Sequence, residues 1–328
     1  MKKLTSWIIL ILILILILLI RISVRSHYKT KFLFKGKEII KIEFKDIDNK
    51  DVVLKKENDD WIVLTSTAIY PANKERIKLI LEKLEGFKLS ELISKKPSTY
   101  ENYQLNESSA TKIRVYYGKN KSKDIWFGKT GGFIYNECYV RIDEKPEVYL
   151  ASGITSDEFM DQFYHYCSRT ILKSDIDKIN FVRVRIDNKT YEFKKELKDD
   201  TTTWVNLKVS KKIDSERFNS YLRNFDEFIG DVIIEPTDYN LDKLIKPILE
   251  INLKYEDNTE VLIYVYDKLD VKIRSKWSTN TLQLYPVKIK CLTSKGPSVE
   301  IISNENIVYC IYDFRFKNLK TILEIPIL

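Results

Sequence analysis

An internal repeat is the feature that most constrains how this chain can fold. The residues Ile-Asp-Asn-Lys at 47–50 recur at 186–189, and Trp61 recurs as Trp204. The apolar stripe of the helix expected after each tryptophan recurs too: Ile77, Ile80, Leu81, Leu84 and Phe87 in the first copy, and Phe218, Tyr221, Leu222, Phe225 and Phe228 in the second. The matches keep their order while small insertions separate them. The body of the chain is therefore predicted to be one structural unit present twice.

Each copy has the pattern of an α+β unit. Alternating apolar residues predict two strands around an Asp-Asn-Lys turn, and a third strand begins at the tryptophan. A helix capped by Asn73 or Asp214 follows, and its apolar spacing gives it one buried stripe. Further strands complete the first copy, and a last helix has Thr155 and Glu158 spaced as a capping box. In the first copy the strands are predicted at 39–44, 52–56, 61–64, 89–93, 113–117, 124–127, 139–142 and 148–150, and the last helix at 155–166.

The predicted fold class is therefore α+β: an N-terminal transmembrane helix followed by two repeated units of antiparallel sheet with a packed helix. Residues 1–31 form the membrane anchor and its basic flank, residues 38–172 the first unit, and residues 177–328 the second unit. The second unit carries extra strand-like sequence near 268–298.

The N-terminus predicts a membrane anchor. Residues 4–20 carry no charge, and residues 8–20 are an unbroken run of Ile and Leu. At 1.5 Å per residue the uncharged run is roughly 25 Å long as a helix, close to the lower limit for a bilayer core. Trp7 and the flanking Lys3 and Arg21 are placed as interfacial residues. We expect the chain to contact the lipid bilayer through residues 4–20.

Two alternatives to an uncleaved anchor have weaker support. A cleaved signal peptide needs small residues at its cleavage site, and only Val24-Arg25-Ser26 resembles one. A lipoprotein needs a cysteine directly after the run, but the first is Cys138. Basic residues on both sides of the run give opposing signals for orientation. Because a short N-terminus before a single anchor is usually kept inside, we expect a single pass through the bacterial cytoplasmic membrane with the body exported.

The charge distribution argues against a nucleic-acid partner. The chain has 55 Lys+Arg, 47 Asp+Glu and a net charge of +8. Six of the basic residues and no acidic residue lie within the first 31 positions, so the body is nearly neutral. A basic patch is the electrostatic signature of nucleic-acid binding, and no nucleic acid is therefore expected as a partner.

The sequence contains no recognisable motif for catalysis or for cofactor or metal binding, and we predict no catalytic, cofactor-binding or metal-binding residues. Neither His27 nor His165 lies in a nucleophile motif, and the four cysteines have no paired spacing. Asp46-x-Asp48 lacks the glycine of a calcium loop, so a hairpin turn is expected there. The glycines at 128, 131 and 132 are also interpreted as a hairpin turn, and the acidic pairs at 59–60 and 199–200 as solvated turns.

A family resemblance joins several of these features. The Trp61-Ile62-Val63 strand, the Tyr103-Gln104-Leu105 and Tyr239-Asn240-Leu241 steps, and the strands Tyr139-Val140-Arg141 and Val148-Tyr149-Leu150 stand in the order typical of the bacterial domain-of-unknown-function family 4340. The chain resembles that family over nearly all residues after 37. Members often have glycine between the Tyr and the Leu, so Gln104 in particular predicts a different turn.

The resemblance implies a function class. Members of the family are often encoded beside ABC-type transport components like those of gliding-motility systems. We therefore expect a membrane-anchored, non-enzymatic accessory or substrate-handling protein with ABC transporter permease and ATPase subunits as partners. Two alternatives stay open: a cell-envelope enzyme whose site the sequence does not reveal, and a structural envelope protein that binds glycan or protein.

Overall fold

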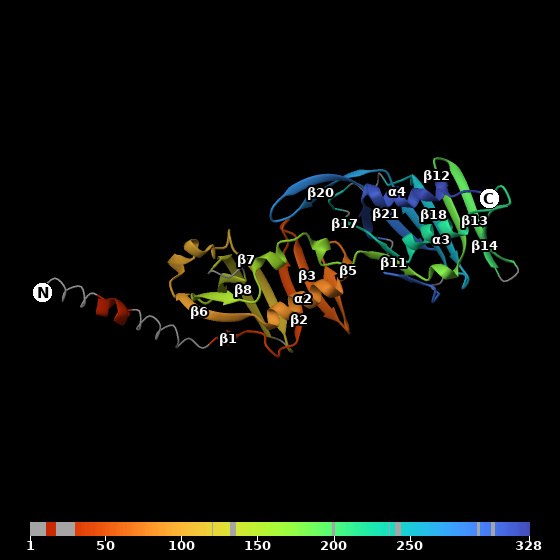
Figure 1. Ribbon diagram of the computed structural model, residues 1–328. Coiled ribbons are helices and arrows are strands. Elements are labelled where there is room, and N and C mark those ends of the chain that lie inside the picture. Colours follow the sequence, from red (N-terminus) through yellow and green to blue (C-terminus); the bar gives the residue numbers. More distant parts are fainter. Residues whose placement is uncertain are drawn as a thin grey trace. The chain divides into compact units, whose positions relative to one another are not determined.

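The computed structural model describes residues 11–17, 30–119, 121–131, 136–198, 201–235, 237–239, 244–293, 296–302 and 306–328 (Figure 1). Contacts divide these residues into two units. The first comprises residues up to Ser66 together with Lys74–Asp161, and the second comprises Thr67–Asn73 and Gln162–Leu328. This division follows contacts in space, so the repeat boundaries 38–172 and 177–328 stay predictions.

The described residues of the first unit form an antiparallel sheet and the α-helix α2, besides the helical residues 11–17. Its strands pair only antiparallel, in the order β1-β6-β10-β9-β8-β7-β2-β3-β4. The elements are β1 Lys31–Phe32, β2 Ile39–Lys45, β3 Asp51–Glu57, β4 Asp60–Leu64, α2 Lys74–Glu85, β6 Lys88–Ser94, η1 Pro97–Thr99, η2 Glu101–Tyr103, β7 Thr111–Tyr117, β8 Lys121–Thr130, β9 Glu137–Ile142, β10 Val148–Ser152 and η3 Ser156–Phe159.

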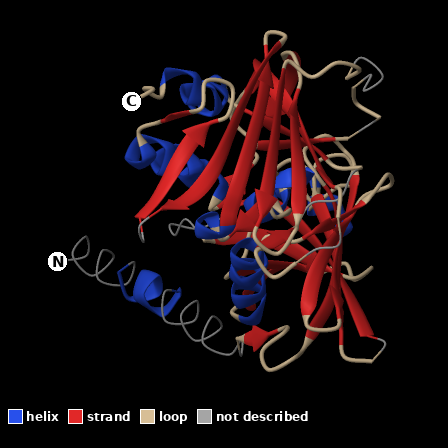
Figure 2. Ribbon diagram, turned by 90° about the vertical axis from the view of Figure 1, so that its right-hand side faces the viewer, coloured by secondary structure: helices blue, strands red, loops and turns tan. Residues whose placement is uncertain are grey.

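The second unit is also built from antiparallel strands. It contains β5 Ile69–Pro71, η4 Phe163–His165, β11 Thr170–Ser174, η5 Ile176–Lys178, β12 Ile179–Ile186, β13 Lys189–Lys198, β14 Thr201–Asn206, β15 Lys211–Lys212, α3 Ser215–Leu222, η6 Arg223–Phe225, β16 Glu227–Ile229, β17 Val232–Ile234, β18 Leu249–Tyr255, β19 Glu260–Val265, β20 Leu269–Arg274, β21 Thr279–Cys291, β22 Val299–Ile301, β23 Val308–Ile311, α4 Asp313–Lys320 and η8 Thr321–Glu324. Strands are the predominant secondary structure of both units (Figure 2), and the α+β fold class is confirmed.

The two sheets share one strand order. Eight strands of the first unit follow one another as β6-β10-β9-β8-β7-β2-β3-β4, and in the second unit the order is β17-β23-β21-β19-β18-β12-β13-β14. Position by position, the strands of the two series occur in the same sequence along the chain. The helices α2 and α3 also correspond, because each lies between the tryptophan strand and the next edge strand of the series. The same fold topology therefore occurs twice.

Alternation explains why these residues form strands with one buried face. Ile42 and Phe44 of β2 and Leu54 of β3 are buried, whereas their neighbours along the strand are more exposed. The hairpins turn as predicted at residues 47–50 and 186–189. Asn49 in the first turn and Asn188 in the second have positive φ, which the short polar side chain of Asn tolerates.

The predicted helix at 155–166 is wrong. The structure has two short 3-10 turns there, η3 and η4, and the side chain of Thr155 forms no cap. The Glu158 carboxylate, which a capping box requires, is engaged by the neighbouring helix. It binds Arg76 at 3.1 Å and Lys83, both of which lie on α2. An ion pair with the neighbouring helix therefore replaces the capping box.

Two glycine-related expectations also need correction. Gly128 is not in a hairpin turn but inside β8, where a Cβ atom would lie only 2.0 Å from the carbonyl oxygen of Tyr103. Gln104 adopts the left-handed conformation, with φ 56°, so the turn keeps the backbone that glycine would favour. Gly132 and Asn240 lie outside the described residues.

The predicted anchor lies largely outside the described residues. Of residues 4–20, residues 11–17 are described, and they form a helix with exposed Ile and Leu side chains. Within the part of the chain that the structure describes, no helix is long and apolar enough to span a membrane. Attachment through residues 4–20 therefore stays a prediction.

Candidate functional site

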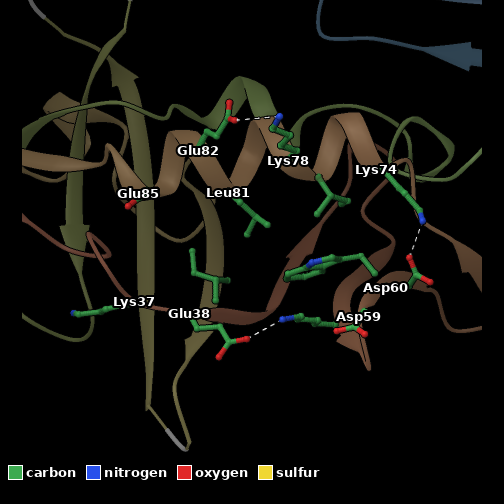
Figure 3. A pocket seen from close by; sticks show the side chains of 13 residues that line it. Lys37, Glu38, Asp59, Asp60, Lys74, Lys78, Leu81, Glu82 and Glu85 are labelled. Atoms are coloured by element: carbon green, nitrogen blue, oxygen red, sulfur yellow. Dashed lines mark hydrogen bonds and ion pairs between the residues drawn. The ribbon is translucent and has the colours of Figure 1, made fainter.

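A groove in the first unit is the best candidate for a site. It runs between α2 and the strands that carry Trp61 and Ile39, and it encloses a cavity of about 520 Å³ (Figure 3). Six of its residues belong to α2 and recur at intervals of three and four along the whole helix. The lining residues are Lys37, Glu38, Ile39, Lys56, Asp59, Asp60, Trp61, Lys74, Ile77, Lys78, Leu81, Glu82 and Glu85.

The floor of the groove is apolar. Ile39 of β2 and Ile77 of α2 are buried, whereas Leu81 and the indole of Trp61 are half-buried. Trp61 pairs with Lys56 across β3 and β4, which fixes its place on the sheet next to the helix. A half-buried indole beside a leucine offers apolar surface that a ligand can cover.

Charges of both signs form the rim. Lys56 binds Glu38 at 2.8 Å, Lys74 binds Asp60 at 2.8 Å, and Lys78 lies 3.9 Å from Glu82 one turn further along α2 (Figure 3). These side chains are largely exposed, so each pair contributes little to folding stability. The rim therefore presents paired charges that can exchange partners when a ligand binds.

The electrostatics of the rim suit binding better than proton transfer. The hydrogen bond from Lys56 lowers the pKa of Glu38, and the same bond raises the pKa of Lys56. A general acid at neutral pH needs the opposite shift, with a carboxyl pKa raised towards 7. Partial burial lowers the pKa of Lys37, whose ammonium group donates to the Leu33 carbonyl at 2.6 Å.

The corresponding place in the second unit is filled. Trp204 pairs with Lys195 as Trp61 pairs with Lys56, so the two tryptophans are equivalent. However, Trp204 is only 1% exposed. Its ring lies 4.5 Å from that of Phe218, and its indole N–H donates to Asn219 Oδ1 at 3.0 Å.

The sequence difference that opens the first-unit groove lies on the helix. Ile77 stands where the second unit has Phe218, and Lys78 stands where it has Asn219. Isoleucine is too short to stack on the indole, and the charged end of Lys78 turns to Glu82 on the exposed side. Trp61 is therefore equivalent to Trp204 in position but not in burial.

The histidine and cysteine residues considered from the sequence do not lie in this groove. Cys138, Cys167 and Cys310 are buried free thiols, and burial raises the pKa of each, to about 12 for Cys138. Thiols of this kind are poor nucleophiles. His165 is exposed and stacks on Tyr164, with 4.4 Å between the ring centroids, while His27 lies outside the described residues.

The acidic segments serve as turns where they are described. Asp46 Oδ1 accepts hydrogen bonds from the backbone N–H groups of Asp48 at 2.8 Å and Lys50 at 3.0 Å, which confirms the predicted turn. Asp60 opens β4 and joins the groove rim, whereas residues 199–200 are not described. In the described part of the chain, no group of three or more His, Cys, Asp or Glu side chains could hold a metal ion.

The groove is not predicted from the sequence. The repeat itself contains the signal, because Ile77 and Lys78 of α2 stand where α3 has Phe218 and Asn219. Recognising it requires knowing that these positions face the tryptophan, and only the folded unit shows this.

Comparison with known proteins gives a family. The family model described as "Domain of unknown function (DUF4340)" matches residues 61–244. No curated protein and no solved structure matches the chain. The match covers more than half of the 328 residues and begins at Trp61, in the strand that forms the groove floor. The chain therefore belongs to the DUF4340 family.

Proposed function

We propose that this chain is a membrane-anchored, non-enzymatic accessory or substrate-handling protein of an ABC-type transport system, and that it binds its partner in the Trp61 groove. The observation that carries the proposal is the open groove itself, since the equivalent place in the second unit is closed by Phe218 and Asn219. The family resemblance supports the link to ABC-type transport.

The shape of the groove favours a polypeptide as the occupant. Its lining follows α2 from Lys74 to Glu85, which at 1.5 Å per residue is roughly 17 Å. An amphipathic segment could place apolar side chains on Trp61 and Leu81 while its charged side chains meet the rim. A permease subunit, which exposes loops on the same side of the membrane as the groove, would supply such a segment.

The proposal also includes the membrane anchor and the origin of the two units. Residues 4–20 would hold the chain in the cytoplasmic membrane, with the body outside the cytoplasm. The shared strand order and the repeated sequence support two copies of one ancestral unit. In that case one copy kept a closed core at its tryptophan while the other presents a binding surface.

Two leucines on the same helix provide the test. Leu81 lines the groove, whereas Leu79 is 40% exposed and does not line it. The full chain would be co-expressed with the ABC permease and ATPase of the same genome. We expect Leu81→Arg to reduce co-purification of these subunits at least about tenfold, because a buried unpaired charge at an interface is strongly unfavourable. Leu79→Arg should retain the complex.

A photo-reactive amino acid at position 81 gives the direct readout. Cross-links from this position to the permease, absent from position 79, would support the proposal. If the permease is not cross-linked from position 81 while both variants remain folded by circular dichroism, the proposed partner is wrong.

A further inference from the structure

The second unit carries a ribbon that its counterpart lacks. Strands β8 and β9 of the first unit are neighbours in the sheet and follow directly in sequence. Their counterparts in the second unit are β19 and the second half of β21, which are also neighbours in the sheet. Between them in the sequence lie β20 and the first half of β21, which pair with each other over Leu269–Leu284. These residues lie within the region near 268–298 where the sequence predicts extra strands. The ribbon extends beyond the sheet of its own unit (Figure 1).

The outer edge of the ribbon is already occupied. The backbone N–H of Lys272 donates to the Tyr239 hydroxyl at 3.1 Å, and that of Arg274 donates to Gln162 Oε1 at 2.8 Å. The Lys272 carbonyl accepts from Gln162 Nε2 at 3.4 Å. Because these edge groups have partners, addition of another strand to the ribbon is disfavoured. A binding partner would instead contact the side chains at the tip of the ribbon.

The tip presents a tryptophan in a fixed turn. Trp277 is 84% exposed, far more than any other tryptophan among the described residues. The backbone N–H of Ser275 donates to the Ser278 carbonyl at 2.8 Å, which closes the turn, and the Ser275 hydroxyl accepts from the N–H groups of Trp277 and Ser278. The Lys276 ammonium lies 4.9 Å from the centre of the indole ring.

The tip is also basic. Lys272, Arg274 and Lys276 are exposed, and no acidic residue occurs between Asp270 and Glu300. Trp277 lines neither the cavity beside Arg217 nor the cavity beside Lys173, and its side chain is open to solvent. An exposed indole on a basic tip matches the surface of an anionic bilayer. There an indole prefers the headgroup level, and Lys and Arg are attracted to the lipid charge.

We propose that the β20–β21 ribbon contacts an anionic phospholipid bilayer, with Trp277 inserted at the headgroup level. This contact is independent of the Trp61 groove and of the anchor at residues 4–20. It would hold the second unit against a lipid surface and would depend on lipid charge and on salt.

The test uses the full chain in liposomes. Because Trp277 is exposed, Trp277→Phe should leave the fold intact, and the difference in emission between wild type and variant isolates this indole from the others. In vesicles containing phosphatidylglycerol we expect brominated acyl chains to quench the Trp277 emission, and acrylamide to quench it several-fold less than in detergent. In pure phosphatidylcholine this lipid quenching should be largely lost.

Charge variants complete the design. Lys272→Gln should weaken the equilibrium for contact with the anionic bilayer on the order of fivefold, read as reduced quenching by brominated lipid, as expected for one basic residue at an anionic surface. Lys290→Gln, at an exposed position of β21 in the sheet, should not. Absence of lipid quenching at both compositions would overturn the proposal and leave a protein surface as the occupant. Equal quenching in both lipids would refute the requirement for anionic charge.

Discussion

The single residue Gln104 adopts the left-handed backbone conformation that glycine favours in a turn. Its φ of 56° lies in the left-handed region, which costs a side chain with a Cβ atom about 1–2 kcal/mol. The surroundings impose it: the backbone N–H of Leu105 donates to the Tyr100 carbonyl at 2.9 Å, and the Leu105 side chain is fully buried.

Gln104→Gly should therefore stabilise the protein. Relief of the left-handed strain outweighs the extra freedom that glycine has in the unfolded chain, and we expect a net gain of about 0.5–1 kcal/mol. Urea unfolding monitored by circular dichroism measures it. Gln104→Ala is the control, since alanine keeps the Cβ atom and should give no gain. Equal effects of Gly and Ala would show that the backbone strain is not the cause.

Helix-to-sheet packing explains the different roles of the two tryptophans at the scale of elements. In the second unit, α3 closes on β14 through Phe218, which contacts both Trp204 and Phe193. In the first unit, α2 approaches β4 with aliphatic and charged side chains and leaves the indole of Trp61 half-buried. The same pair of elements thus makes a closed core in one copy and a groove in the other.

Removal of each tryptophan should reveal this difference. We expect Trp204→Ala to lower the free energy of unfolding by about 3–5 kcal/mol, because it removes a buried ring and a hydrogen bond. Trp61→Ala should lower it by about 1–2 kcal/mol, since less apolar area leaves water there on folding. Denaturant melts of the two variants provide the comparison. Similar large losses would mean that Trp61 is a core residue and that the groove is closed in solution.

Membrane attachment is a property of the whole molecule that we expect residues 4–20 to determine. The run at residues 4–20 is the longest uncharged apolar stretch of the chain, and the body after it is nearly neutral. We expect a variant without residues 1–25 to appear in the soluble fraction and the full chain in the membrane fraction. A high-salt wash should precede the measurement, because it also weakens the contact proposed for the ribbon.

A smaller truncation provides the control for this experiment. Removal of residues 2–3 alone should leave the chain in the membrane, since the apolar run is intact. Retention of the longer truncation in the membrane after the wash would place the anchor elsewhere in the chain.

Local patterns determined much of the architecture. Strand alternation at residues 39–44, the Asp-Asn-Lys turns and the apolar stripe of α2 depend on neighbours within a few residues, and these elements are confirmed. The helix predicted at 155–166 does not form. Glu158, which is predicted to cap it, forms ion pairs with Arg76 and Lys83 of α2, and the local sequence does not indicate such distant partners.

Which surfaces are open depends on contacts between elements that lie far apart in the sequence. The repeat placed Trp61 and Trp204 in equivalent strands, yet whether an indole is covered depends on side chains that another element brings across it. Likewise, the extra sequence near 268–298 predicts strands, whereas the ribbon and the exposed Trp277 follow from which strands pair with which. The burial of a side chain depends on its contacts with segments far apart in the sequence, and a local sequence pattern does not contain this information.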